Sequence, residues 1–304
     1  MTEVAFHTVS TVDQALALVG DGTDVQVVAG GSDLMVGARH GKALPSTVVA
    51  IHRIAELEGV DASGDALRIG ALVSHAEISE NAAIRQGWTA LADASALVGS
   101  HATRNVGTLG GNLMNASPAM ETGGPLIVLD ASVTLRSTAG ERTIPIEQLW
   151  SGPGSTTAAT GELCIGVVVP APSARTGSAY VRLEYRRAME IAIVAASACV
   201  TLAEDGSVVA ARVALTSLAP TIIRSVGAES ALIGTDGGPV ALDAVAAGAS
   251  ADAKPISDLR AKEDYRRAMA GVIAKRAVSV ALTRARGESF PIPATPVFME
   301  RSAQ

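Results

Sequence analysis

Short apolar runs alternate with helical segments along the first half of the chain. A strand is predicted at 25–29, a Gly-Gly break at Gly30 and Gly31, and a helix at 33–40. Ser74 and Glu77 have the spacing of a capping box. The other predicted elements are strands at 47–51, 67–72, 132–137 and 162–169, and helices at 75–80, 88–98 and 124–129.

A change of pattern divides the chain near residue 175. The segment 170–177 is rich in Pro, Ser and Gly and is the predicted linker. Residues 179–218 read as β-rich, and the rest as helical, ending in an amphipathic helix at about 262–286. We therefore expect one domain over 1–173, a second over 177–289, and a loose tail at 290–304.

Composition excludes several classes of protein. Of the 304 residues, 48% are apolar and 18% are charged, enough to bury a sizeable core. The net charge of −6, with no basic cluster, argues against nucleic-acid binding. No signal peptide and no apolar run long enough to cross a membrane is visible. We expect a cytoplasmic protein without membrane insertion, while export together with a partner is left open.

Two cysteines limit the redox chemistry that this chain can carry alone. Cys164 and Cys199 lie far apart, each inside an apolar run, and read as small buried hydrophobes. They are too few to ligate an iron–sulfur cluster with four thiolates. If this protein moves electrons, any cluster on their path belongs to another chain.

Two glycine loops are the candidate ligand-binding segments. In the first, 29–33, adjacent glycines expose backbone amides, and Ser32 and Asp33 are predicted to cap the following helix. Such a loop can bind a pyrophosphate, although an ordinary structural turn has the same pattern. The second, 108–112, repeats the Gly-Gly pair between a Thr and an Asn. Together they favour an extended dinucleotide ligand.

Competing motifs are absent. The sequence has no G-x-G-x-x-G, no complete P-loop and no G-x-S-x-G, and its five histidines lack metal-ligand spacing.

The two loops and five further segments resemble the medium, FAD-binding subunit of molybdenum hydroxylases, the family that includes carbon monoxide dehydrogenase and the flavin region of xanthine dehydrogenase. The matching segments, in the family's order, are 28–35, 69–78, 104–112, 115–118, 161–163 with Pro170, 186–192 and 265–267. They are distributed across nearly the whole chain. Each is weakly specific alone, and their shared order is specific.

The resemblance implies an α+β fold, with a PCMH-like FAD-binding domain of two subdomains, about 1–55 and 56–173, followed by a C-terminal domain of sheet and helices. FAD would lie extended between the subdomains, and the chemistry would be the cofactor's. Arg182, where the family often has a Lys, would tune the flavin by its charge; an exposed surface arginine is the alternative. The implied cofactor-binding residues are Ala29, Gly30, Gly31, Ser32, Asp33, Leu34, Thr108, Gly110, Gly111, Asn112, Ser117, Glu121, Leu163, Cys164 and Arg182.

The same resemblance implies partners and a reaction. A large subunit would hold the molybdenum-pterin cofactor and hydroxylate the substrate, and a small subunit would carry 2Fe-2S clusters, in a dimer of heterotrimers. Electrons would pass through those clusters to FAD and on to an external acceptor.

Departures from the family pattern bear on the substrate. Ser32-Asp33 replaces the His-Ser common in carbon monoxide dehydrogenases, and Asn112 replaces an Asp. This favours an organic substrate, an N-heterocycle, purine-like compound or aldehyde, over carbon monoxide. Two alternatives stay open: a stand-alone FAD-dependent oxidoreductase of the same fold, and an assembly subunit that has lost its flavin.

Overall fold

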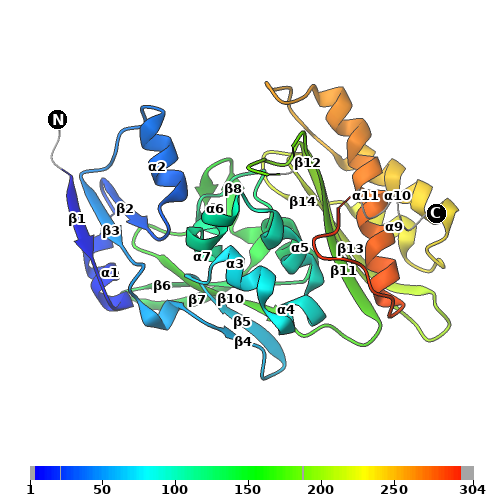
Figure 1. The fold of residues 1–304 in the computed structure, drawn as a ribbon, viewed down its shortest axis with the longest axis horizontal. Helices are drawn as coiled ribbons and strands as arrows, with labels where there is room; N and C mark the ends of the chain where they lie inside the picture. Colours follow the sequence, from blue (N-terminus) through cyan, green and yellow to red (C-terminus); the bar gives the residue numbers. More distant parts are fainter. Residues whose placement is uncertain (1–3, 21, 187, 296–304) are drawn as a thin grey trace.

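The computed structural model describes residues 4–20, 22–186 and 188–295, which form three consecutive sheet-and-helix layers along the long axis of the molecule (Figure 1). The first layer is a parallel three-stranded sheet in the order β1-β3-β2. Its elements are β1 (Ala5–Thr8), α1 (Val12–Val19), β2 (Val25–Val28), α2 (Ser32–Arg39) and β3 (Thr47–Ala50). Helix α1 buries Val12, Ala15, Leu16 and Val19 in a small apolar core against this sheet.

Helix α2 differs from α1 because none of its residues is buried. In Figure 1 it stands at the edge of the molecule, apart from the helices that follow. Its place is fixed by the strand before it and by the turn at Gly31, and not by an apolar face.

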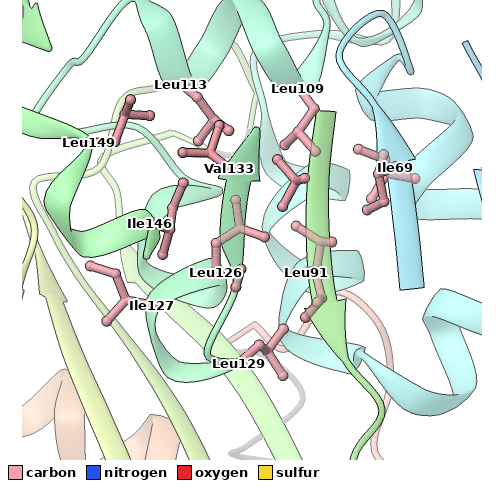
Figure 2. Packing of buried hydrophobic residues seen from close by; sticks show 14 of the residues in the cluster. Ile69, Leu91, Leu109, Leu113, Leu126, Ile127, Leu129, Val133, Ile146 and Leu149 are labelled. Carbon is pink, nitrogen blue, oxygen red and sulfur yellow. The ribbon is translucent and has the colours of Figure 1, made fainter. Parts of the chain in front are cut away.

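The second layer is an antiparallel five-stranded sheet in the order β4-β5-β10-β6-β7, covered by short helices. Its strands are β4 (Val60–Asp61), β5 (Ala66–Gly70), β6 (Ser132–Ser137), β7 (Gly140–Pro145) and β10 (Leu163–Pro170), with a small ribbon of β8 (Trp150–Gly152) and β9 (Ser155–Thr156). Its helices are α3 (His75–Glu80), α4 (Ala82–Gly87), α5 (Thr89–Leu97), α6 (His101–Val106), α7 (Leu109–Met114) and α8 (Gly123–Val128), with 3₁₀ turns η1 (Ala55–Leu57) and η2 (Ile146–Gln148). Figure 2 shows the core, where Leu109 and Leu113 of α7 and Leu126 of α8 meet Val133 of β6.

The third layer is an antiparallel sheet, β11-β12-β13-β14, with two helices packed on it and a third helix packed on those two. Its elements are β11 (Thr176–Leu183), β12 (Val194–Leu202), β13 (Val208–Thr216), β14 (Ile223–Arg224), α9 (Val226–Leu232), α10 (Pro239–Asp252) and α11 (Glu263–Ala285). One face of this sheet is apolar and packs on α11 and α9. The other face carries Tyr180, Arg182 and Ser197 and packs on α5 and α8 of the second layer.

Most predicted elements are present, and the α+β fold is confirmed. Three local predictions were wrong. Neither Ser32 nor Asp33 caps α2, because the N-cap residue is Gly31, and no side chain caps this helix. Strand β10 runs through Pro170 instead of ending before it. Residues 290–295 are not loose: Ala294 is buried and its amide donates to Asp93 Oδ1 (3.0 Å). The tail beyond, 296–304, lies outside the described residues, as does Arg187 of the family pattern.

None of the helices in the described part of the chain is long and apolar enough to cross a membrane.

Candidate functional site

The first glycine loop ends in a helix whose first amides have no acceptor in the described structure. Gly31 adopts the left-handed conformation (φ 72°, ψ 3°), which a residue with a side chain rarely takes. The first backbone bond of the helix runs from Met35 N–H to Gly31 O (3.0 Å). The amides of Ser32, Asp33 and Leu34 therefore point out of the helix end, where the helix dipole favours an anion.

Asp33 is the one residue of this loop that opposes an anion. It lies in the first turn of α2, so its carboxylate competes for the same positive helix end.

Gly30 brings the two loops together. A Cβ at this position would lie 1.7 Å from Val106 O and 3.2 Å from Gly107 N, both backbone atoms of the segment that leads into the second loop. Backbone cannot move aside as a flexible side chain can, so only glycine allows this approach. The prediction that the two loops serve one site is therefore consistent with their contact.

The amides of the second loop are occupied, contrary to the prediction that its glycines expose them. They donate from Leu109 to Val73 O (2.9 Å), from Gly110 to Ala71 O (2.9 Å) and from Gly111 to Thr108 Oγ1 (3.1 Å). Thr108 is thus the N-cap of α7. A Cβ on Gly110 would lie 2.7 Å from Ala71 Cβ, so this glycine is required for packing. The second loop can therefore offer a ligand its side chains and its surface, and not its first amides.

Asn112 connects the second loop to a buried ion cluster. Its Oδ1 accepts a hydrogen bond from Thr122 Oγ1 (2.6 Å), which leaves its amide nitrogen for another partner. The residue before Thr122 is Glu121, 6% exposed, whose Oε1 lies 2.8 Å from Arg182 Nη1.

Arg182 is buried and paired on both sides, so the alternative of an exposed surface arginine is wrong. Its side chain is 2% exposed; Nη1 donates to Glu121 and to Leu97 O (2.9 Å), and Nε donates to Glu184. Two carboxylates on one guanidinium also mean that Arg182 is not a free positive charge. Burial raises the pKa of Glu121 to about 7, an effect that the Arg182 charge opposes.

Three further residues were predicted to bind the cofactor: Ser117, Leu163 and Cys164. Ser117 follows α7, and its Oγ accepts from Ala119 N–H (3.3 Å). Leu163 (5% exposed) and Cys164 (3%) point into two different apolar cores, so they can reach a ligand only through their backbone. Burial raises the pKa of the Cys164 thiol to about 12, in agreement with its reading as a small hydrophobe.

Sequence reasoning missed three residues of this region. Glu184 is two residues after Arg182 and could have been found from that spacing, because alternate residues of a strand share a face. Tyr180 has the same relation to Arg182 on its other side, and its buried hydroxyl has no hydrogen-bond partner among the described residues. Thr122 carried no signal in the sequence.

Comparisons with known proteins agree with this organisation. The sequence profile described as "FAD binding domain in molybdopterin dehydrogenase" matches residues 2–172, and that described as "CO dehydrogenase flavoprotein C-terminal domain" matches residues 179–281. The chain is 32% identical over 281 residues to the carbon monoxide dehydrogenase medium chain of Hydrogenophaga pseudoflava. The aligned region covers 92% of this chain and 97% of that relative. It is 33% identical over 277 residues to the 6-hydroxypseudooxynicotine dehydrogenase complex subunit alpha of Paenarthrobacter nicotinovorans. That alignment covers 91% of this chain and 93% of the relative.

A solved structure gives the same answer. Carbon monoxide dehydrogenase from Hydrogenophaga pseudoflava matches with a TM-score of 0.89 at 32% identity, covering 93% of this chain and 98% of that chain. The family and the two-domain fold predicted from the sequence are confirmed. The chain belongs to the family of FAD-binding medium subunits of the molybdenum hydroxylases, and is an oxidoreductase subunit with its own FAD-binding domain.

Proposed function

We propose that this chain holds FAD with its pyrophosphate at the N-terminal end of α2 and relays electrons within a molybdenum hydroxylase complex. The observation that carries the proposal is the set of amides at Ser32, Asp33 and Leu34. They have no acceptor among the described residues, and the contact between Gly30 and Val106 holds them beside the second loop. Bound FAD supplies the electron-accepting chemistry, and the residues of this chain position it.

The predicted site residues take different parts in this proposal. Ala29 to Leu34 bind the pyrophosphate through backbone. Thr108, Gly110 and Gly111 shape the second loop, with Asn112 and Ser117 offering side chains. Glu121 and Arg182 act as a paired cluster near the flavin, while Leu163 and Cys164 contribute backbone. In this reading 1–173 forms the FAD-binding domain and 177–289 the C-terminal domain.

The complex proposed around this chain has a large molybdenum-binding subunit and a small iron–sulfur subunit, arranged as a dimer of heterotrimers in the cytoplasm. Electrons pass from the 2Fe-2S clusters to FAD and then to an external acceptor. The substrate proposed is an organic N-heterocycle, purine-like compound or aldehyde. The support is Ser32-Asp33 and Asn112, which depart from the pattern of carbon monoxide dehydrogenases.

The first test is the absorption spectrum of the protein purified gently from its host, with the released flavin identified and co-purifying chains weighed. FAD with iron–sulfur absorption and two partner chains is expected. A lone chain that carries FAD and turns over a substrate would replace the proposal with the stand-alone oxidoreductase. An intact assembly without flavin would leave only the assembly subunit.

The pyrophosphate position has its own test, Asp33→Asn. Removing a carboxylate from the first turn of α2 should tighten FAD binding about two- to fivefold, because 0.3–1 kcal/mol is typical for a charge at a helix end. Asp13→Asn is the matched control, since Asp13 lies in the first turn of α1, a helix of the same length. Equal dissociation constants for the two variants, measured by flavin fluorescence, would place the pyrophosphate elsewhere, and weaker binding by Asp33→Asn would contradict the electrostatic role of Asp33.

A further inference from the structure

The cluster of Glu121, Arg182 and Glu184 has an odd charge count. One guanidinium lies between two carboxylates, at 2.8 Å from Glu121 and in direct contact with Glu184. With both carboxylates ionised the cluster carries a net charge of −1, and with one protonated it is neutral. A buried site of this kind can change its charge by one proton without rearranging its side chains.

Glu121 is the carboxylate better placed to hold that proton. Its side chain is 7% exposed, against 18% for Glu184, so its charged form has lost more hydration. The hydrogen bond from Arg182 Nη1 is accepted by Oε1 of Glu121 and not by the second oxygen, Oε2. A proton on Oε2 would therefore leave the pair between Oε1 and Arg182 intact.

Other charged groups near the cluster do not compete for this role. Arg182 and the neighbouring Arg104 keep their charge at any ordinary pH. Burial, together with the Glu121 charge, raises the pKa of Tyr180 well above its usual value, so its phenol stays neutral. Glu190, whose carbonyl oxygen lies 3.4 Å from Arg182 Nη1, has its carboxylate paired with Arg186 (3.4 Å).

The cluster is also close to the second glycine loop. Glu121 directly precedes Thr122, whose hydroxyl donates to Asn112 next to Gly111. Negative charge that arrives on a flavin near this loop would raise the free energy of a nearby carboxylate, because like charges in a poorly hydrated site interact strongly.

Given the FAD site proposed above, we propose that Glu121 takes up a proton from solvent when the bound FAD is reduced and releases it when FAD is reoxidised. Two electrons reach FAD from the oxidised substrate through the complex, one proton joins the flavin, and one converts the Glu121 carboxylate to the carboxylic acid at Oε2. When the external acceptor removes the two electrons, both protons return to solvent. Arg182 then serves as a fixed partner that keeps Glu121 in place, and not as the counter-charge of the reduced flavin.

The experiment is a redox titration of FAD in the purified complex at several pH values from about 6 to 9, for wild type and Glu121→Gln. Burial raises the pKa of Glu121 to about 7, so in oxidised wild type the carboxylate is ionised only above that pH. Above about pH 7 the midpoint potential of wild type should fall more steeply than that of Glu121→Gln. One extra proton per two electrons is a tenfold change in the equilibrium constant per pH unit, or about 30 mV.

Glu229→Gln is the matched control, because Glu229 is a similarly buried carboxylate (5% exposed) paired with Arg224 in the C-terminal part. The midpoint potential of FAD in Glu229→Gln should depend on pH as it does in wild type. Equal slopes for wild type and Glu121→Gln would overturn the proposal, while a complex without FAD would instead overturn the FAD site on which it rests.

A second readout needs no variant. The infrared difference spectrum of reduced minus oxidised wild-type complex above pH 7 should show a new carboxylic-acid carbonyl band. That band should be missing from Glu121→Gln if this variant folds. A reduced wild-type complex without any such band would contradict the proposal even if Glu121→Gln failed to assemble.

Discussion

Gly30 lies where the two glycine loops meet, and its missing side chain decides how closely they approach. Gly30→Ala would place a methyl group 1.7 Å from Val106 O, so the loops must separate. We expect a loss of about 1–3 kcal/mol of stability, the usual cost of overpacking, together with weaker FAD retention. Urea unfolding and flavin content measure the two effects. Gly64→Ala is the control, because a Cβ there meets nothing within 4 Å; a similar loss in both variants would refute this reason.

His75 should make the protein sensitive to acid. Burial, with help from the Arg104 charge, lowers the pKa of His75 to about 4 from 6.5, so the folded state binds fewer protons than the unfolded state between these values. Stability from the neutral imidazole is therefore present above about pH 6.5 and lost as pH falls toward 4, by about 3 kcal/mol in total.

His75→Leu removes this titration. Its unfolding free energy, measured by urea titration at several pH values, should fall less than that of wild type between about pH 6.5 and 4. It also removes Nδ1, which is buried without a partner among the described residues. Parallel pH profiles of the two proteins would show that His75 is not the group responsible.

Single residues also show where sequence reasoning ends. The buried state of Arg182 was not predictable, because its partner Glu121 is 61 positions away and is brought to it only by the packing of two layers. The amides of Leu109 and Gly110 were misjudged for the same reason: their acceptors are backbone atoms of the segment after β5. A Gly-Gly pair indicates that another group can approach the backbone closely. It does not indicate whether that group is a ligand or another segment of the chain.

At the scale of elements, the short helices of the second layer depend on their caps. Thr108 Oγ1 accepts from Gly111 N–H (3.1 Å), so Thr108→Ala should cost about 1 kcal/mol and also expose that amide. Thr108→Ser should restore most of the loss in thermal or urea unfolding. Thr11→Ala, which removes the equivalent cap of α1, should cost a similar amount of stability with no change in FAD affinity. An altered FAD affinity in Thr11→Ala but not in Thr108→Ala would contradict the place of Thr108 in the site.

Elements were predictable where their signals are local. Ser74 and Glu77 form the predicted capping box, because both partners lie within one turn of α3. The start of α2 was misread because Ser and Asp after a strand usually cap a helix, and the left-handed Gly31 moved the boundary by one residue. Strand β10 continues to Pro170 because that residue pairs with Ala66, a partner about a hundred positions earlier.

At the scale of the whole molecule, the second and third layers are joined by polar contacts at β11, the edge strand of the third sheet. The largest is at Asp93 of α5, fully buried, which accepts from Arg284 Nη1 (2.6 Å) and Nη2 (3.0 Å) of α11. It also accepts from the amides of Tyr180 (3.2 Å) and Ala294 (3.0 Å). One carboxylate thus holds four donors from β11, α11 and the segment after it.

Asp93→Asn tests whether this contact makes the two domains unfold together. An Asn turns one oxygen into an NH₂ group that must face a donor, and it leaves Arg284 without its charge partner. We expect a loss of about 3–5 kcal/mol and two separate transitions in calorimetry where wild type shows one. Asp130→Asn is the matched control, because Asp130 pairs with Arg212 across the same two layers (2.7 Å) but is 64% exposed. An exposed pair is worth about 1 kcal/mol or less. Equal effects of the two substitutions would mean that apolar packing, and not the buried carboxylate, couples the domains. A single transition like that of wild type in Asp93→Asn would also mean that apolar packing couples the domains, because the contacts of the Asp93 carboxylate with its four donors would then not be needed for the coupling.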